Sequence, residues 1–155
     1  MFIDAHSHGM HADRGPDGRL VPPLRPIWDG SLMTPAEYVG RAHEIGLEGV
    51  VILDPPGVTF ELKRLFGDYV IPAPQVDLET ATPAEIDRLF AQGASGIKFI
   101  GPVRPYCDDS YLPVYERVLA HNGLAVFHTG FLALRMFDPG GLLGRSRHLD
   151  ITHMR

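Results

Sequence analysis

The chain has 155 residues, of which 45% are hydrophobic and 21% are charged, and its formal net charge is −5, a composition that fits one soluble globular domain and argues against disorder. Its 14 basic residues include only two lysines and form no cationic run, so we expect no nucleic-acid partner. No apolar run is long enough to span a bilayer, and the single cysteine, Cys107, excludes an internal disulfide framework, so we expect a cytoplasmic protein without a membrane partner.

The first predicted element is a strand in the opening segment FIDAHSHG, residues 2–9. Phe, Ile and Ala followed by a closing glycine favour a strand, and alternation then places Asp4, His6 and His8 on one face. Two imidazoles at the carboxyl end of a strand can bind one metal ion. A polar strand end with solvated histidines is the alternative interpretation.

A repeated motif starts two of the predicted helices. The sequence TPAE occurs at residues 34–37 and 82–85, where Thr suits the N-cap, Pro the first helical position and Glu a capping box. Gly46 and Gly93 are expected to end these helices. Each helix leads into a β-rich run, at residues 49–53 and 95–100.

The remaining elements complete an alternating α/β order. They are a weak helix at 59–66, a strand at 69–73, a helix at 110–122 and a strand at 124–128. Strands that alternate with helices imply about five parallel strands joined by four helical crossovers. Two long irregular segments remain, Gly9 to Met33 and Thr129 to Arg155. The first would overhang the carboxyl ends of the strands, where α/β folds place their sites.

Two later strand residues belong with the opening histidines. Lys98 points inward if its neighbours Ile97 and Phe99 pack beneath helices. His128 is the last residue of the final predicted strand. The carboxyl ends of the strands are therefore predicted to bring together His6, His8, Lys98 and His128.

Four segments of the chain together resemble the amidohydrolase superfamily, in particular its amidohydrolase-related branch of metal-dependent hydrolases and decarboxylases. They are FIDAHSHG at the start, GIKFIGP around Lys98, LPVYERVLAHNGL, and AVFHTG around His128. The resemblance runs from Met1 to about Gly130 and implies a (β/α)8 barrel. It also implies that His6, His8 and His128 bind a divalent metal ion, most often zinc.

The resemblance is incomplete at its carboxyl end. Members of the family also use a histidine from the sixth strand and an aspartate from the eighth, and a (β/α)8 barrel typically needs about 250 residues. Asp150 and His153 lie in the tail and do not match those motifs. Residues 1–155 therefore resemble a single partial barrel domain. We expect a truncated chain, or else a barrel completed by a homo-oligomer or by a separate carboxyl-terminal half.

The implied activity is that of a metal-dependent hydrolase acting on a small organic substrate at a C–N or C–O bond. The metal would lower the pKa of its bound water from about 15.7 toward roughly 7 and polarise the scissile carbonyl. Lys98 would be a catalytic residue, either carboxylated and bridging two metals or acting as a charge near the substrate. An ion pair with Asp4 or another inward acid is the structural alternative. Asp4 is also a candidate to orient a ligating histidine.

Three alternatives compete with the interpretation as a hydrolase of small organic substrates. A non-oxidative decarboxylase of the same family uses the same metal scaffold, so these residues do not separate the two. A non-catalytic half-barrel that binds metal or a partner is favoured by the missing eighth-strand aspartate. A phosphoesterase or deoxyribonuclease of the same barrel type would carry a glutamate in a GEIG-like setting, where the sequence has GIK at residues 96–98.

Overall fold

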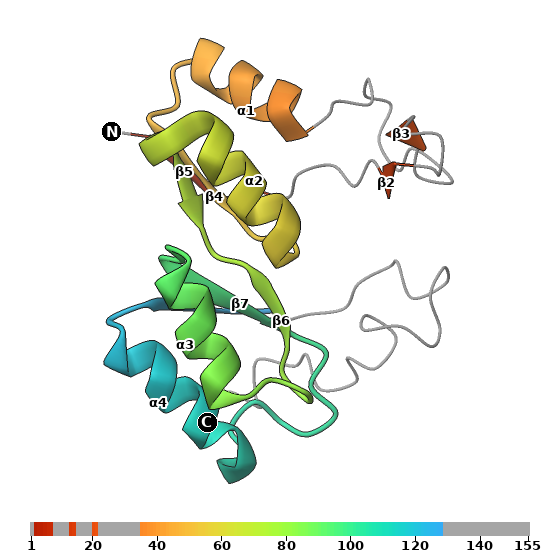
Figure 1. Ribbon diagram of the computed structural model, residues 1–155, viewed down its shortest axis with the longest axis vertical. Helices are drawn as coiled ribbons and strands as arrows, with labels where there is room; N and C mark the ends of the chain where they lie inside the picture. Colours follow the sequence, from red (N-terminus) through yellow and green to blue (C-terminus); the bar gives the residue numbers. More distant parts are fainter. Residues whose placement is uncertain (1, 8–12, 15–19, 22–34, 129–155) are drawn as a thin grey trace. The chain divides into compact units, whose positions relative to one another are not determined.

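The computed structural model of the protein describes residues 2–7, 13–14, 20–21 and 35–128. The chain divides into two compact units, Met1–Pro72 and Ala73–Arg155. Each unit contains a sheet of three parallel strands, and a helix separates each strand from the next along most of the chain (Figure 1). The predicted α/β class with parallel strands is therefore confirmed. The assignment of residues 1–155 to one partial barrel stays a prediction.

The first unit has the strand order β1-β4-β5. Its main elements are β1 (Ile3–Ser7), α1 (Pro35–Glu44), β4 (Gly49–Ile52), α2 (Pro56–Phe66) and β5 (Val70–Pro72), with a 3-10 turn at Gly67–Tyr69. A short antiparallel pair, β2 (Asp13–Arg14) and β3 (Leu20–Val21), lies in the segment predicted to be irregular. Strands of two residues are too short for hydrophobic alternation to reveal.

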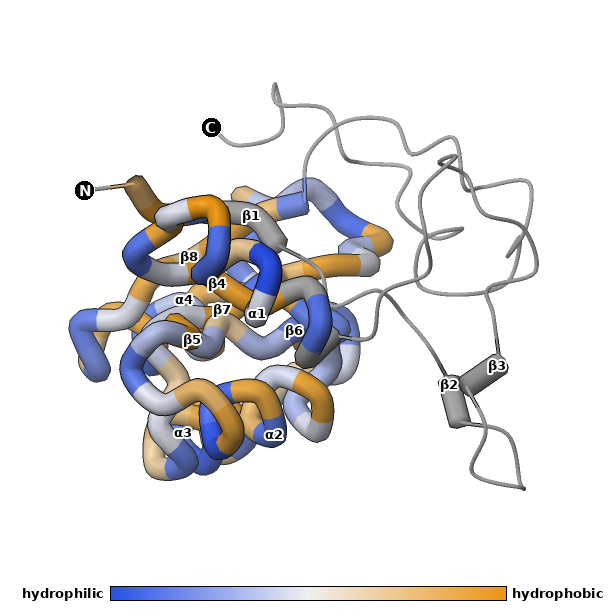
Figure 2. The backbone as a smooth tube through the Cα atoms, turned by 90° about the horizontal axis from the view of Figure 1, so that it is seen from above, coloured by the Kyte–Doolittle hydropathy of each residue, from blue (hydrophilic) through white to orange (hydrophobic). Residues whose placement is uncertain are grey.

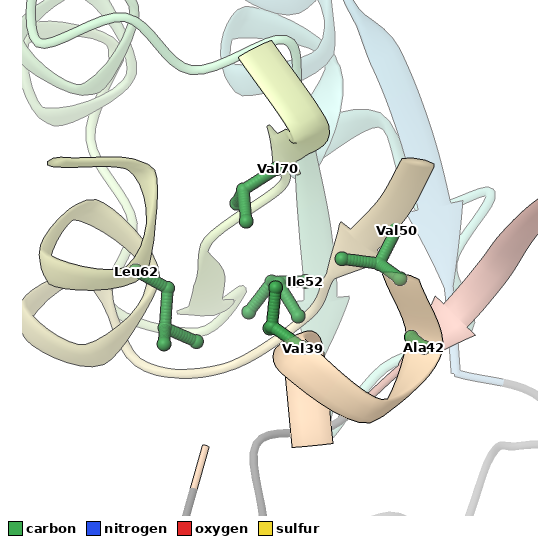
Figure 3. Close-up of a cluster of buried hydrophobic side chains, with 6 residues drawn as sticks. All are labelled: Val39, Ala42, Val50, Ile52, Leu62 and Val70. Carbon is green, nitrogen blue, oxygen red and sulfur yellow. The ribbon is translucent and has the colours of Figure 1, made fainter. Parts of the chain in front are cut away.

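Aliphatic side chains form the core of the first unit (Figure 3). The buried cluster consists of Val39, Ala42, Val50, Ile52, Leu62 and Val70. Because α1 and α2 both contribute to it, both helices cover the sheet face that carries Val50 and Ile52. Val51, between these two residues, lies on the opposite face and is also buried.

The second unit has the strand order β6-β7-β8. Its elements are β6 (Gln75–Asp77), α3 (Pro83–Ala91), β7 (Gly96–Ile100), a 3-10 turn (Asp109–Tyr111), α4 (Leu112–Ala120) and β8 (Leu124–Phe127). The helices α3 and α4 lie side by side (Figure 1). The sequence did not predict β6, because Pro72 and Pro74 interrupt the apolar run before it and it has only three residues.

The helix ends confirm the predicted turn chemistry. Thr82 is the N-cap of α3, and its Oγ1 accepts a hydrogen bond from the backbone N–H of Glu85 at 3.2 Å. Gly46 and Gly93 follow α1 and α3 with φ angles of 86° and 98°, which residues with a Cβ rarely adopt. Thr34, the other predicted N-cap, lies outside the described residues.

Two helices begin at other residues than predicted. α2 begins at Pro56 and not near residue 59, because a proline in the first turn lacks only an N–H that would have no helical partner. α4 begins at Leu112, after a 3-10 turn capped by Asp108, whose carboxylate accepts the Ser110 N–H at 3.0 Å.

The helices are amphipathic. Figure 2 shows them changing between hydrophilic and hydrophobic colours along their length. In α3, Ile86 and Leu89 are fully buried while Arg88 is exposed. Within the part of the chain that the structure describes, no helix combines the length and the apolar character that crossing a membrane requires.

Candidate functional site

The register of the second sheet gathers polar residues on one face. Lys98 of β7 pairs with Gln75 of β6 and with Val126 of β8. Residues that pair, and residues two positions apart on a strand, share a face. Asp77 and His128 therefore lie on the same face as Lys98. This polar group lies toward the carboxyl ends of parallel strands, where α/β folds place their sites.

The opposite face of β7 packs beneath α4, as predicted. The rings of Phe99 and Tyr115 meet edge to face with their centroids 5.3 Å apart, and Phe127 meets Tyr115 in the same way at 5.6 Å. Ile97 and Phe99 are fully buried. Lys98 accordingly lies on the face turned away from α4.

Lys98 is buried without a hydrogen-bond partner among the described residues. Its side chain is only 1% exposed, and no described atom accepts a hydrogen bond from Nζ. Burial lowers the pKa of Lys98 because it removes water from the ammonium form. The ion pair with an inward acid that the sequence allowed is therefore not formed as a hydrogen-bonded pair within the described chain.

The backbone of His128 is fixed on both sides of its Cα atom. Its N–H donates to the carbonyl of Phe99 at 3.2 Å, and its carbonyl accepts from the Tyr106 hydroxyl at 2.9 Å. The residue directly follows β8 and is half-buried. Its position at the carboxyl end of β8, beside β7, matches the strand position from which the sequence predicted a metal ligand.

The opening histidines belong to the first unit. The backbone of His6 lies in β1, and His8 lies outside the described residues. Among the residues that the structure describes, no group of three or more His, Cys, Asp or Glu side chains is arranged to hold a metal ion. The ligand set His6, His8 and His128 therefore stays a prediction.

A bulge interrupts the strand that carries His6. Three residue steps in β1, from Asp4 to Ser7, match two steps in β4, from Val50 to Ile52. A bulge inserts one extra residue, re-aims the side chains around it and is common beside active sites. Because the register shifts after Asp4, strict alternation no longer determines on which face of β1 His6 lies.

Two acids at strand ends escaped the sequence analysis. Asp77 ends β6, and its Oδ1 accepts the backbone N–H of Glu79 at 3.1 Å. Asp54 closely follows β4 and is fully buried, and its backbone carbonyl accepts from the Thr59 hydroxyl at 2.8 Å. The available signal was an acid directly after a buried apolar run for Asp54, and the polar–apolar–polar alternation of β6 for Asp77.

A polar cluster joins the loops that follow β6 and β7. Glu79 accepts hydrogen bonds from the Val103 N–H at 2.8 Å and from the Tyr111 hydroxyl. Arg104 lies over the Tyr111 ring, 5.0 Å from its centroid, and its guanidinium is 3.6 Å from the carboxylates of both Glu79 and Asp108. Since two carboxylates balance its charge, Arg104 is poorly suited to bind an anionic substrate.

Comparisons with known proteins support the fold class. No protein-family model matches the chain, and no curated protein matches it. The crystal structure of Agrobacterium tumefaciens ATU3138, an apo structure, is similar to the chain with a TM-score of 0.50 at 18% sequence identity. The similarity covers 88% of this chain and 50% of that one, so this chain spans about half the length of the solved protein. At this identity the similarity supports the fold alone.

Proposed function

We propose that this protein is a metal-dependent hydrolase that acts on a small organic substrate at a C–N or C–O bond. One observation carries the proposal: β7 and β8 bring the buried Lys98 and the half-buried His128 to one face of a parallel sheet, at its carboxyl end. The amidohydrolase-like segments around these two residues support the same activity.

The proposal includes a more specific fold. Two steps relate the eight strands to a barrel: β5 and β6 count as one strand interrupted at Ala73 and Pro74, and the short pair β2 and β3 is left aside. The remaining order then corresponds to the first five strands and four helices of a (β/α)8 barrel. In such a barrel the carboxyl ends of all strands surround one site, which would include both His6 and His128. We assign residues 1–155 to a single partial barrel of this kind.

Zinc is the metal that the proposed donors suit best. Neutral imidazole nitrogens are common zinc ligands, and His6, His8 and His128 would supply three of them. The donor that the structure describes, His128, has its backbone hydrogen-bonded on both sides. A bound divalent metal would lower the pKa of a coordinated water toward roughly 7 and polarise the scissile carbonyl.

Lys98 is the residue that we assign to substrate binding. Its ammonium group carries three donors, and no described residue accepts from them. A carboxylate or carbonyl oxygen of the substrate would satisfy these donors, and charge-assisted hydrogen bonds of a buried group such as Lys98 are strong. Because burial lowers its pKa, Lys98 also gives up a proton at lower cost than an exposed lysine.

The test begins with the metal content of the purified chain, measured by mass spectrometry. We expect about one zinc per chain in the wild type and clearly less zinc per chain in His128→Ala, because one of three protein ligands is removed. His43→Ala is the matched control, since His43 is exposed on α1 and its ring packs edge to face against Tyr69 at 5.2 Å. This variant is expected to keep its metal.

Hydrolysis is then measured on a panel of small amides, esters and lactones, with and without a chelator. Activity that the chelator removes and zinc restores supports the proposal. Metal binding without turnover of any substrate on the panel would favour the non-catalytic half-barrel. Equal metal content in the wild type and His128→Ala would contradict the assignment of His128.

A further inference from the structure

The loop after β7 reaches across to the end of β8 through one tyrosine. Tyr106 is 2% exposed, and its hydroxyl donates to the carbonyl of His128 at 2.9 Å. The same hydroxyl lies 3.4 Å from the carbonyl of Phe99, which also accepts the His128 N–H. Tyr106 therefore links the carboxyl ends of two neighbouring strands.

The hydrogen bond from the Tyr106 hydroxyl is the second of two that fix the backbone at His128. The N–H of a residue belongs to the planar peptide group before its Cα, and the carbonyl belongs to the planar group after it. Both groups are hydrogen-bonded at His128, the first to β7 and the second to Tyr106. Fixing both planes fixes φ and ψ, and hence the direction in which the Cβ of His128 leaves the chain.

Tyr106 is itself held firmly. Its backbone carbonyl accepts the Tyr115 hydroxyl at 2.8 Å, and its ring meets Phe127 edge to face at 5.1 Å. Phe127 is the residue directly before His128. The aromatic contacts would survive the loss of the hydroxyl, because phenylalanine fills the same space as tyrosine. Among the described residues, the partners of the hydroxyl are main-chain oxygens at the carboxyl ends of β7 and β8.

We infer that Tyr106 is a positioning residue for His128: its hydroxyl fixes the peptide group after His128 and so sets the direction in which the side chain leaves the strand toward the metal. The inference rests on the proposed function, in which His128 is a metal ligand. Groups that orient a ligating residue typically change metal affinity by about 10–100-fold when they are lost. Tyr106→Phe removes the positioning hydrogen bond and leaves the ring in place.

The experiment compares Tyr106→Phe with Tyr111→Phe in the full chain. Tyr111 is also 2% exposed and donates its hydroxyl to Glu79, so the control loses a buried hydroxyl of the same unit whose acceptor is a side chain in the loop after β6. Two quantities are measured: the affinity for Co2+, from its visible absorption, and the hydrogen exchange rate of the His128 amide, by NMR.

We expect Tyr106→Phe to bind Co2+ about tenfold more weakly and to exchange the His128 amide about fivefold to tenfold faster, as the loss of one buried hydrogen bond allows. Tyr111→Phe is expected to match the wild type in both. Equal Co2+ affinity in Tyr106→Phe and the wild type would overturn the positioning role.

A wild-type chain that binds no Co2+ would contradict the proposed function, and the exchange rate would then decide the inference on its own. If the His128 amide exchanges faster in Tyr106→Phe but not in Tyr111→Phe, the result supports the inference that Tyr106 fixes the backbone of His128. An unchanged exchange rate in Tyr106→Phe would overturn that inference.

Discussion

The two sheets use the same helix-to-strand unit but differ at one position of their central strands. β4 and β7 begin with Gly49 and Gly96, and both strands are buried along their whole length. The third residue is Val51 in β4 and Lys98 in β7, each on the face turned away from the helices that cover its sheet. A strand buried on both faces normally consists of apolar residues. Val51 shows that an apolar residue suits this position of a buried central strand, so packing alone does not explain why β7 has a lysine there.

The cores of the two units also differ in polarity, and again the second unit has the polar groups. The first core is a cluster of Val, Ala, Ile and Leu side chains. The second contains aromatic rings, and Tyr106 and Tyr115 each donate a hydroxyl to a backbone carbonyl. Hydrogen bonds of this kind fix atoms more narrowly than aliphatic contacts do, because they depend on direction as well as distance. In the second unit, which carries Lys98 and His128, tyrosine hydroxyls therefore hold main-chain oxygens within the core.

The largest effect is expected when the charge is moved to the first sheet. Val51→Lys would bury an unpaired ammonium group in β4, at the position that corresponds to Lys98 in β7. We expect a loss of about 3–5 kcal/mol in the free energy of unfolding, the range seen when a buried charge lacks a partner. Urea denaturation followed by circular dichroism measures it.

Val51→Met serves as the control for the longer side chain without its charge and should cost about 1–3 kcal/mol, less than Val51→Lys. A loss below about 1 kcal/mol for Val51→Lys would mean that the first sheet also accommodates a charge at this position. The contrast between β4 and β7 would then disappear.

The next largest effect concerns the glycines that begin the two central strands. A Cβ on Gly96 would lie 2.7 Å from the backbone oxygen of Leu124, whereas a Cβ on Gly49 would lie 3.3 Å from the backbone oxygen of Tyr69. We expect Gly96→Ala to cost about 2–3 kcal/mol, because a Cβ 2.7 Å from a backbone oxygen forces the backbone to shift, and Gly49→Ala to cost less than about 1 kcal/mol, because the 3.3 Å approach needs only a small adjustment. Thermal unfolding of the two variants compares them directly, and equal losses would contradict the closer approach of β7 to β8.

A gain in stability is expected when the charge is removed from the second sheet. Lys98→Met keeps an unbranched side chain and removes an ammonium group that has no hydrogen-bond partner among the described residues. Relief of this desolvation should raise the free energy of unfolding by about 1–2 kcal/mol. The same variant should lose substrate binding, since it lacks the ammonium donors that we assign to the substrate. A less stable Lys98→Met protein would show that Lys98 serves the fold.

The smallest effect concerns ion pairs on the surface of each unit. Asp87 of α3 accepts hydrogen bonds from Arg117 of α4 at 2.7 and 2.8 Å, and the Arg117 guanidinium, followed by the His121 ring, lowers the pKa of Asp87 below the ordinary 3.8. The stabilisation is therefore present above pH 3.8 and lost as the pH falls through the lowered pKa. Asp87→Asn should lower the urea midpoint at pH 7, and its difference from the wild type should shrink as the pH falls below 3.8. In the first unit, the exposed pair Arg41–Glu44 should allow Glu44→Gln without a measurable change at pH 7.

The sequence predicted those features of the fold that depend on neighbouring residues. Thr82 and Gly93 bound α3 because an N-cap and a left-handed C′ glycine act within one helical turn. The face of Lys98 followed from alternation along β7, since that strand is regular. The same reasoning does not hold at His6, because a bulge in β1 is set by the pairing with β4 and leaves no local mark in the sequence.

The features that the sequence did not predict depend on residues far apart in the chain. Tyr106 and His128 are separated by 22 positions, and nothing near Tyr106 indicates which carbonyl its hydroxyl meets. β6 is recognisable mainly from its pairing with β7, because three residues carry too little periodicity. Local patterns thus predict which residues reach the carboxyl end of the sheet, and contacts between the strands determine how firmly they are held there.

The carbonyl of His128 accepts the Tyr106 hydroxyl, and the carbonyl of Phe99 accepts the His128 N–H. Both acceptors are main-chain atoms, so no substitution at residue 99 or 128 can delete them. During evolution the side-chain anchor at the end of β8 can therefore be lost or regained only through the donor at position 106, or through a shift of the strands themselves. Sequence drift elsewhere in this core would leave this anchor in place for as long as a hydroxyl remains within reach of the His128 carbonyl oxygen.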